Sequence, residues 1–278
     1  MDAEPYQATP AWVAELAELG PFFAIGTHPV GAGPHPPWRP MADLLGDGRA
    51  LRNRVVSVRA ALAVASGQAS EGVELRIAAS VTQLGLAARL ISPVLGRAVT
   101  SDAVLRLDLE EVWWQPLLGG AFPLSISQPA PAASTGGAPS SPAELAALIG
   151  RTLLDGPIAA LVSAVAHAVP ISAHILWGNV ASAVNGAATI IATQRPDLAP
   201  RAHAVSTALL MQPPLSRSHT GVGTYFRRRS CCLIYRISPA GRKQLCADCL
   251  LLETVASRRD KPPLALRRSK VKELGSWY

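Results

Sequence analysis

The stretch YFRRRSCCLIYR, residues 225–236, and the stretch LCADCL, residues 245–250, contain every cysteine of the 278-residue chain. An adjacent pair of cysteines is followed by a spacer and then by a C-x2-C pair; the four are Cys231, Cys232, Cys246 and Cys249. Four soft thiolates in one short segment suit a tetrahedral zinc ion or an iron–sulfur cluster. We therefore interpret the rest of the chain as a scaffold for this segment.

Three chemistries compete for this cysteine pattern. Two disulfides would need a secreted chain, but Met1-Asp2-Ala3-Glu4 begins neither a basic n-region nor an apolar h-region, so we expect a reducing compartment. Structural zinc sites usually pair two C-x2-4-C units, whereas Cys231 and Cys232 are neighbours. Neighbouring side chains on an extended chain point in opposite directions, so such a pair fits two irons more easily than one ion. The pattern favours a 2Fe-2S cluster and leaves zinc open.

The run RRRSCCLIYR, residues 227–236, together with LCADCL and the earlier Leu176-Trp177-Gly178-Asn179, resembles the FhuF-type ferric-siderophore reductases. Weaker similarity extends upstream through residues 87–95. The resemblance implies a 2Fe-2S cluster held by the four cysteines, on a family motif written C-C-x10-C-x2-C. Here the spacer is three residues longer, and residues 241–244 are the candidate insertion. The exposure and reduction potential of the cluster depend on groups near the sulfurs, so a changed spacer bears on both.

Several side chains near the motif are candidates for substrate contact or for supporting the ligands. They are Arg228, Arg229, Arg236, Tyr235, Trp177 and Asn179. Arginines beside the cysteines would attract an anionic chelate and favour the more negative reduced cluster, and we expect Arg228 to be one such exposed charge. A glycine inside a helix costs about 1 kcal/mol relative to alanine, so Gly178 predicts close approach of another backbone. We expect Asn179 to hydrogen-bond the cysteine segment.

Charge is concentrated toward the cysteine end of the chain. The whole chain has a formal net charge of +7, and from residue 195 onward 16 Lys and Arg face 5 Asp and Glu, a net +11. A basic field favours anionic partners: nucleic acid, a membrane surface, an acidic redox protein or an anionic iron chelate. With 49% apolar and 16% charged residues, the composition excludes a disordered or fibrous protein.

The periodicity predicts a predominantly α-helical α+β fold with a small antiparallel β element and a C-terminal iron–sulfur loop carrying the four cysteines. Residues 41–95 show helical spacing, with Pro93 expected to end or kink the second helix. Alternation at residues 105–109 predicts a strand with one wet face, and residues 112–127 predict a hairpin. Arg89, among apolar neighbours, would face a substrate pocket, reach the surface or pair with a carboxylate.

Five segments follow from composition: 1–127, a mixed α/β half; 128–142, a Pro/Ala/Ser/Gly linker; 143–222, a helical half; 223–253, the 2Fe-2S segment; and 254–278, a basic tail. Residues 156–194 contain no Asp, Glu, Lys or Arg. Their interruptions and histidines favour two buried helices, roughly 157–168 and 171–192, over a membrane span.

No G-x-G-x-x-G, P-loop, H-E-x-x-H or G-x-S-x-G motif accompanies these elements. We therefore expect a cytoplasmic ferric-siderophore reductase that takes electrons from a separate ferredoxin-like or flavoprotein donor. We also expect peripheral association with the inner face of the membrane near a siderophore importer. Nucleic acid is not expected as a partner. The alternative is a non-catalytic four-cysteine zinc module whose basic tail binds nucleic acid or an acidic protein.

Overall fold

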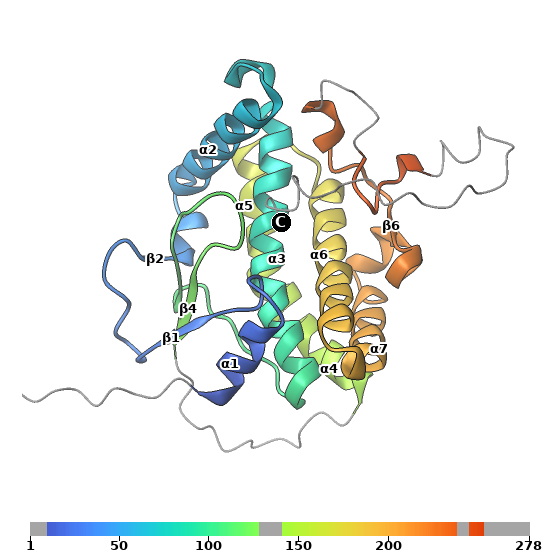
Figure 1. The fold of residues 1–278 in the computed structure, drawn as a ribbon. Helices are drawn as coiled ribbons and strands as arrows, with labels where there is room; N and C mark the ends of the chain where they lie inside the picture. Colours follow the sequence, from blue (N-terminus) through green and yellow to red (C-terminus); the bar gives the residue numbers. More distant parts are fainter. Residues whose placement is uncertain (1–9, 128–140, 238–244, 253–278) are drawn as a thin grey trace, which may run out of the picture.

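The computed structural model describes residues 10–127, 141–237 and 245–252. Helices predominate, and Figure 1 shows them around a central pair. They are α1 (Ala11–Glu18), α2 (Arg49–Ser66), α3 (Leu75–Ser101), α4 (Pro142–Ile149), α5 (Ala159–Ala168), α6 (Ala173–Gln194) and α7 (Ala199–Leu210). The strands are β1 (Gly26–His28), β2 (Arg39–Pro40), β3 (Val112–Trp114), β4 (Leu124–Ser127), β5 (His219–Thr220) and β6 (Arg227–Arg228). The predicted helix-rich α+β fold is confirmed.

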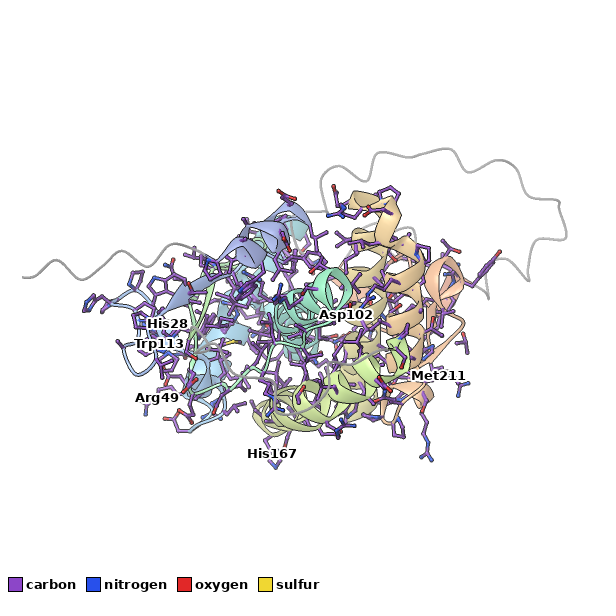
Figure 2. The ribbon with its side chains drawn as sticks, turned by 90° about the horizontal axis from the view of Figure 1, so that it is seen from below. His28, Arg49, Asp102, Trp113, His167 and Met211 are labelled. Carbon is purple, nitrogen blue, oxygen red and sulfur yellow. The ribbon has the colours of Figure 1, made fainter. Side chains whose placement is uncertain are left out.

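The core is built on α3, which packs along α6. Both helices are apolar and rich in alanine, so their backbones approach closely and their side chains fill the interface. α1 docks against the other end of α3 at Gly96, where a Cβ would lie 2.8 Å from Leu16 and 2.9 Å from Phe23. Glycine at this position leaves the space that these two buried side chains occupy. Figure 2 looks along the helices and labels Asp102, the residue that follows α3.

α3 continues through Pro93, so the prediction that the helix would end there is wrong, whereas the predicted kink stays a prediction. Proline removes one hydrogen-bond donor from the helix, which costs about 3 kcal/mol in an exposed helix interior. In α3 the surrounding turn is fully enclosed, with Ile91, Pro93 and Val94 all buried. Burial of this apolar surface offsets the lost hydrogen bond, so tertiary packing overrides the local preference.

A four-stranded sheet, in the order β1-β4-β3-β2, covers one side of the helices. β3 and β4 pair antiparallel, as predicted, and β1 adds to β4 in parallel. The strand predicted at residues 105–109 is wrong: none of these residues belongs to a strand. Leu105, Leu107 and Leu109 are buried alternately with exposed residues, so the period-two pattern reflects burial of one side without a neighbouring strand.

Arg89 lies in the core of the N-terminal half and does not face a pocket or a carboxylate. Its side chain is 2% exposed, and its guanidinium donates to three backbone carbonyls, those of Phe22, Ala24 and Phe122. Burial lowers the pKa of Arg89 to about 10. One cation thus joins α3 to two short segments, the one that precedes β1 and the connection between β3 and β4.

Three helical stretches are long and apolar enough to cross a membrane by length and composition: Leu75–Ser101, Pro142–Ala168 and Ala173–Gln194. The second comprises α4, a π-helical stretch at Gly150–Ile158, and α5. Ser141 caps it, accepting a hydrogen bond from the Glu144 N–H. In this fold 83% of the most apolar window of α3 is buried, against 50% and 56% for the other two, so α3 is the innermost.

The boundaries predicted for the five segments stay predictions. Most of the linker, residues 128–140, and the tail, 254–278, lie outside the described residues, as does the candidate insertion at 241–244. The helices on the two sides of the linker do pack together, α3 with α6 and α2 with α5.

Candidate metal centre

The cysteine segment lies across α6. β6 pairs with β5, and the Arg229 N–H donates to the Ser218 carbonyl, so the chain enters the segment along a short ribbon. Phe226 is buried and stacks on the His219 ring at 5.3 Å between centroids, which anchors this ribbon to the core. The cysteines begin three residues after the buried side chain of Arg228.

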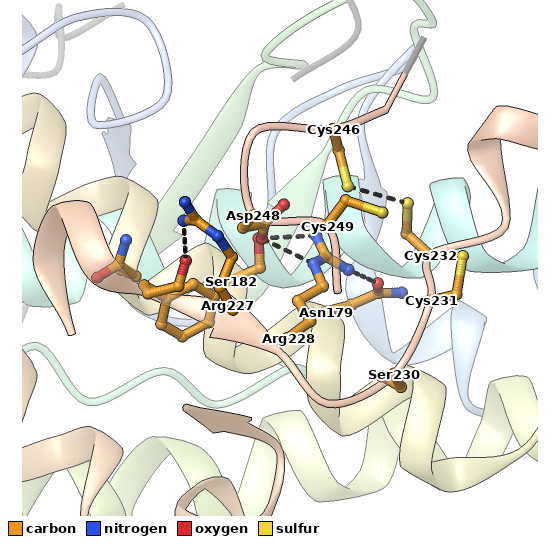
Figure 3. A network of polar contacts seen from close by, with 12 residues as sticks. Asn179, Ser182, Arg227, Arg228, Ser230, Cys231, Cys232, Cys246, Asp248 and Cys249 are labelled. Carbon is orange, nitrogen blue, oxygen red and sulfur yellow. Dashed lines mark hydrogen bonds and ion pairs between the residues drawn. The ribbon is translucent and has the colours of Figure 1, made fainter. Parts of the chain in front are cut away.

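The two cysteine pairs meet although the spacer separates them in sequence. The sulfur atoms of Cys232 and Cys246 are 3.5 Å apart, and all four cysteines are free. Cys232 and Cys249 are buried, whereas Cys231 and Cys246 are half-buried. Figure 3 shows the sulfurs of Cys232, Cys246 and Cys249 turned toward one another, with Cys231 at the edge of the group. The predicted ligand set is therefore assembled in one place.

Backbone N–H groups point at two of the sulfurs. The Leu233 N–H lies 3.3 Å from Cys231 Sγ, and the Leu251 N–H lies 3.4 Å from Cys249 Sγ. Leu233 has a φ of 71°, in the left-handed region that leucine rarely adopts, and this turn brings its N–H back toward Cys231. Hydrogen bonds to cysteine sulfur raise the reduction potential of iron–sulfur clusters. The left-handed conformation of Leu233 thus provides Cys231 Sγ with a hydrogen-bond donor.

Hydrogen bonds among the cysteine side chains shift the pKa values of three of the thiols. Hydrogen bonds from Cys231 and Cys246, together with the positive charge of Arg228, lower the pKa of the Cys232 thiol to about 3. The pKa values of Cys231 and Cys246 are raised, because each thiol donates to Cys232 and both are partly buried. Metal ligation requires thiolates, so the lowered pKa of Cys232 suits this side chain to bind a metal.

Arg228 is at the centre of a polar network behind the sulfurs (Figure 3). Its Nε donates to Asp248 Oδ2 at 2.7 Å, its Nη2 donates to Ser182 Oγ at 2.7 Å, and its Nη1 donates to Asn179 Oδ1. Its backbone N–H also donates to the Asp248 carbonyl at 3.0 Å. Since Asp248 lies between Cys246 and Cys249, this network joins the second cysteine pair to the segment that precedes the first.

Residues 228–249, from this arginine to the last cysteine, match the family model described as the FhuF 2Fe-2S C-terminal domain. The chain carries an FhuF-type 2Fe-2S domain. The predicted resemblance and the predicted cofactor are thereby confirmed. No curated protein matches the chain. The zinc alternative receives no support from the match.

The cysteines of the FhuF-type domain fit a two-iron cluster. In the part of the chain that the structure describes, no three His, Cys, Asp or Glu side chains are placed to hold one metal ion. A 2Fe-2S cluster asks for two thiolates on each iron, so three cysteines need not converge on one point. The vicinal pair and the C-x2-C pair would supply those four thiolates.

A second group of contacts holds the FhuF-type domain on the side away from α6. The short helical turn Ile234–Ile237 lies near the end of α2 and the start of α3. Gln68 Nε2 donates to the Ile237 carbonyl at 2.8 Å, and Arg236 forms an ion pair with Glu74 at 2.6 Å. The cysteine-bearing segment is therefore held between the two central helices of the fold.

The candidate substrate residues divide into three groups in the structure. The prediction that Arg228 is an exposed charge is wrong, because its side chain is 1% exposed and forms an ion pair with Asp248. The sequence alone does not distinguish Arg228 from the arginines on either side of it. Arg236 is exposed but paired with Glu74. Arg229 is exposed, whereas Tyr235 and Trp177 are half-buried, Trp177 against the core. Of the three arginines, Arg229 fits the predicted exposed role.

The prediction for Asn179 is confirmed. Its side-chain oxygen accepts from Arg228, while its Nδ2 donates to the carbonyl and hydroxyl of Ser80 and to Gln83 Oε1. Asn179 is fully buried and therefore connects the FhuF-type domain to α3 through α6.

Three residues whose side chains hold the cysteine segment were not predicted from the sequence: Ser182, Asn185 and Asp248. Asn185 pairs with Gly223 through both backbone groups, donating to its carbonyl at 3.2 Å and accepting from its N–H at 2.9 Å. A signal for two of them exists in the sequence. Asn179, Ser182 and Asn185 recur every three residues in an otherwise apolar helix, which places them on one face.

The cysteine segment comes close to α6 at Gly178. A Cβ at this position would lie 2.2 Å from Ser230 Oγ and 3.6 Å from Ser230 Cβ. The predicted close approach is confirmed, but the neighbour is a side chain and not a backbone. Ser230 Oγ in turn donates to the His174 carbonyl at 3.2 Å.

Gly178→Ala is expected to accelerate loss of the cluster to an iron chelator several-fold. The new methyl group forces the Ser230 hydroxyl away from His174, although the helix itself favours alanine by about 1 kcal/mol. Absorbance at the cluster band over time gives the rate. The double variant Gly178→Ala with Ser230→Ala should regain a near-native rate, because the two methyl carbons would then be in ordinary contact. A double variant as labile as the single one would contradict this account.

Proposed function

We propose that the protein reduces ferric iron bound to a siderophore by one electron, so that ferrous iron is released inside the cell. The observation that carries this proposal is the match of residues 228–249 to the FhuF 2Fe-2S C-terminal domain, on a segment where four cysteines meet. When bound, the cluster supplies one electron at a time. Hard siderophore oxygens hold ferric iron much more tightly than ferrous iron, so one electron loosens the ion.

The chain's own residues would give the chelate access to the cysteines. Cys246 is half-buried and the following Ala247 is exposed, so one edge of the cysteine group reaches the surface. Cys232 and Cys249 lie beneath this edge, shielded from water. A chelate at the exposed edge would therefore approach the cluster without entering the core.

Electrons would come from a separate donor protein, ferredoxin-like or a flavoprotein reductase, because the sequence has no nucleotide-binding fingerprint. We place the reaction in the cytoplasm, including the inner face of the membrane near a siderophore importer. The basic charge of the chain from residue 195 onward suits an acidic donor, an anionic chelate and an anionic surface alike.

The test is single-turnover reduction under anaerobic conditions. Dithionite-reduced protein, freed of excess reductant, is mixed in a stopped-flow instrument with a ferric siderophore and a ferrous-specific chromogenic chelator. We expect one ferrous ion to be trapped for each cluster oxidised. Apoprotein treated in the same way controls for thiol-driven reduction. If the cluster stayed reduced while the ferric chelate was present in excess, the proposed activity would be refuted.

In the same assay, Arg229→Ala is expected to slow reduction of an anionic ferric chelate at low salt by about twofold to fivefold. Arg229 is exposed beside the cysteines, and a nearby positive charge raises the encounter rate of anions. At ~0.5 M salt the effect should largely disappear, because the Debye length is then only a few ångströms. The matched control is Arg106→Ala, an exposed arginine beyond the opposite end of α3. Equal slowing of neutral and anionic chelates at every salt concentration would contradict steering.

A further inference from the structure

The Arg228–Asp248 ion pair is the most enclosed of the ion pairs among the described residues. Its side chains are 1% and 18% exposed, whereas every other pair there is at least one-third exposed on one or both sides. Taking two charges out of water is costly, and a buried pair often contributes little net stability compared with an apolar replacement. A pair kept at such a position is therefore better explained by its effect on the neighbouring group.

Both charges act on the cysteine sulfurs. Asp248 stands between Cys246 and Cys249 in the chain, and the enclosed guanidinium of Arg228 lies against it beside the sulfurs (Figure 3). Reduction adds one negative charge to a cluster, so a positive neighbour favours the reduced form and a negative neighbour disfavours it. With both present, the two effects oppose each other at the sulfurs.

We propose that Arg228 and Asp248 are paired positioning residues that hold the two cysteine pairs together and set the reduction potential of the cluster by opposing charges. The positioning part follows from geometry: residue 228 contacts residue 248 through both its backbone and its side chain. This contact joins the chain three residues before Cys231 to the chain one residue before Cys249. The length of the intervening spacer therefore does not by itself decide where the cysteines meet.

The arginine cannot swing away from this position. Its three nitrogens each have a different acceptor, on Asp248, Ser182 and Asn179. Asn179 is itself fixed by donating to Ser80 and Gln83 of α3. Ser182 also donates to Asp248, so the pair is held from α6 on both members. These protein contacts thus fix the position of both charges near the sulfurs.

The inference concerns the cluster and not its electron acceptor, so it stands or falls separately from siderophore reduction. The experiment measures the reduction potential of reconstituted full-length protein by dye-coupled spectroelectrochemistry, in Arg228→Met, Asp248→Asn and the double variant. We expect Arg228→Met to lower the ratio of reduced to oxidised protein at a fixed potential about tenfold, a shift of about 59 mV for one electron. Asp248→Asn should raise that ratio about tenfold, and the double variant should return to within about threefold of the native ratio.

The positioning role has its own readout, the rate at which iron is lost to a chelator. Arg228→Lys keeps the charge but not the three-way contacts, so it should shed iron several-fold faster while holding a near-native potential. The control is Asp102→Asn, which removes the partner of Arg201 at the far end of α3 and should change neither quantity.

Shifts of the same sign in the two single variants, or a double variant that does not return toward the native potential, would overturn the electrostatic part. If Arg228→Met held no cluster, Asp248→Asn would still decide the sign, because its amide keeps an acceptor for Arg228. A lysine variant that kept its iron as well as the native protein would overturn the positioning part.

Discussion

Cys232→Ser is expected to leave the protein without its native cluster. Cys232 is 4% exposed, its sulfur is 3.5 Å from Cys246, and hydrogen bonds from Cys231 and Cys246 lower the pKa of its thiol. Serine replaces a soft thiolate by a harder oxygen that stays protonated at neutral pH, and iron in a sulfide-bridged cluster prefers sulfur. Iron and acid-labile sulfide per chain should fall to a small fraction of native, with loss of the visible absorbance and of the EPR signal after dithionite.

The same substitution at Cys249 should be equally severe, because that sulfur is also buried and accepts the Leu251 N–H. Ser230→Ala, one residue before the pair, is the matched control: it removes a hydroxyl from the segment but no ligand. Far-UV circular dichroism establishes that each variant keeps its helices. If Cys231→Ser and Cys232→Ser both kept the native spectrum, the adjacent cysteines would not be ligands.

Arg89→Leu is expected to cause a large loss of stability, roughly 3 kcal/mol or more. Three carbonyls, of Phe22, Ala24 and Phe122, would lose their donor in a site that water does not reach. Each unsatisfied buried polar group costs about 1–3 kcal/mol, and partial relaxation recovers some of it. Urea denaturation of the apoprotein, followed by circular dichroism, measures the loss without any contribution from the cluster.

The matched control lies on the same helix. Arg76→Leu removes an exposed arginine paired with Glu74, and exposed ion pairs contribute only about 0–1 kcal/mol. Its denaturation midpoint should stay close to native. A loss below about 1 kcal/mol for Arg89→Leu would mean that the segments around β1 and β4 are held mainly by apolar packing.

The parts of the structure that local chemistry decides were predictable. Four cysteines with this spacing indicate a metal centre, and the apolar periodicity of residues 41–95 and of roughly 171–192 predicts helices regardless of their neighbours, which the structure shows as α2, α3 and α6. The hairpin at β3 and β4 follows from alternation and from Gly119 and Gly120, which both have positive φ.

The wrong predictions share one cause: the local sequence does not show which residues will be buried by segments that are distant along the chain. Pro93 continues a helix because the surrounding core encloses it, and residues 105–109 alternate without a strand partner. Arg228 and Arg229 are adjacent and identical in type, yet one is fully enclosed and the other exposed. Only the position of α6 beneath the segment distinguishes them.

The face of α6 that contacts the cysteine segment determines which residues would be needed to transfer this centre to another protein. Gly178, Asn179, Ser182 and Asn185 provide the clearance and the hydrogen bonds that receive the cysteine segment. All four belong to two turns of one helix, and none is a ligand. A designer who grafted residues 223–252 alone would transfer the thiolates without their receiving surface. Grafting the four helix positions as well, onto any sufficiently straight and buried helix, would make the iron–sulfur unit portable.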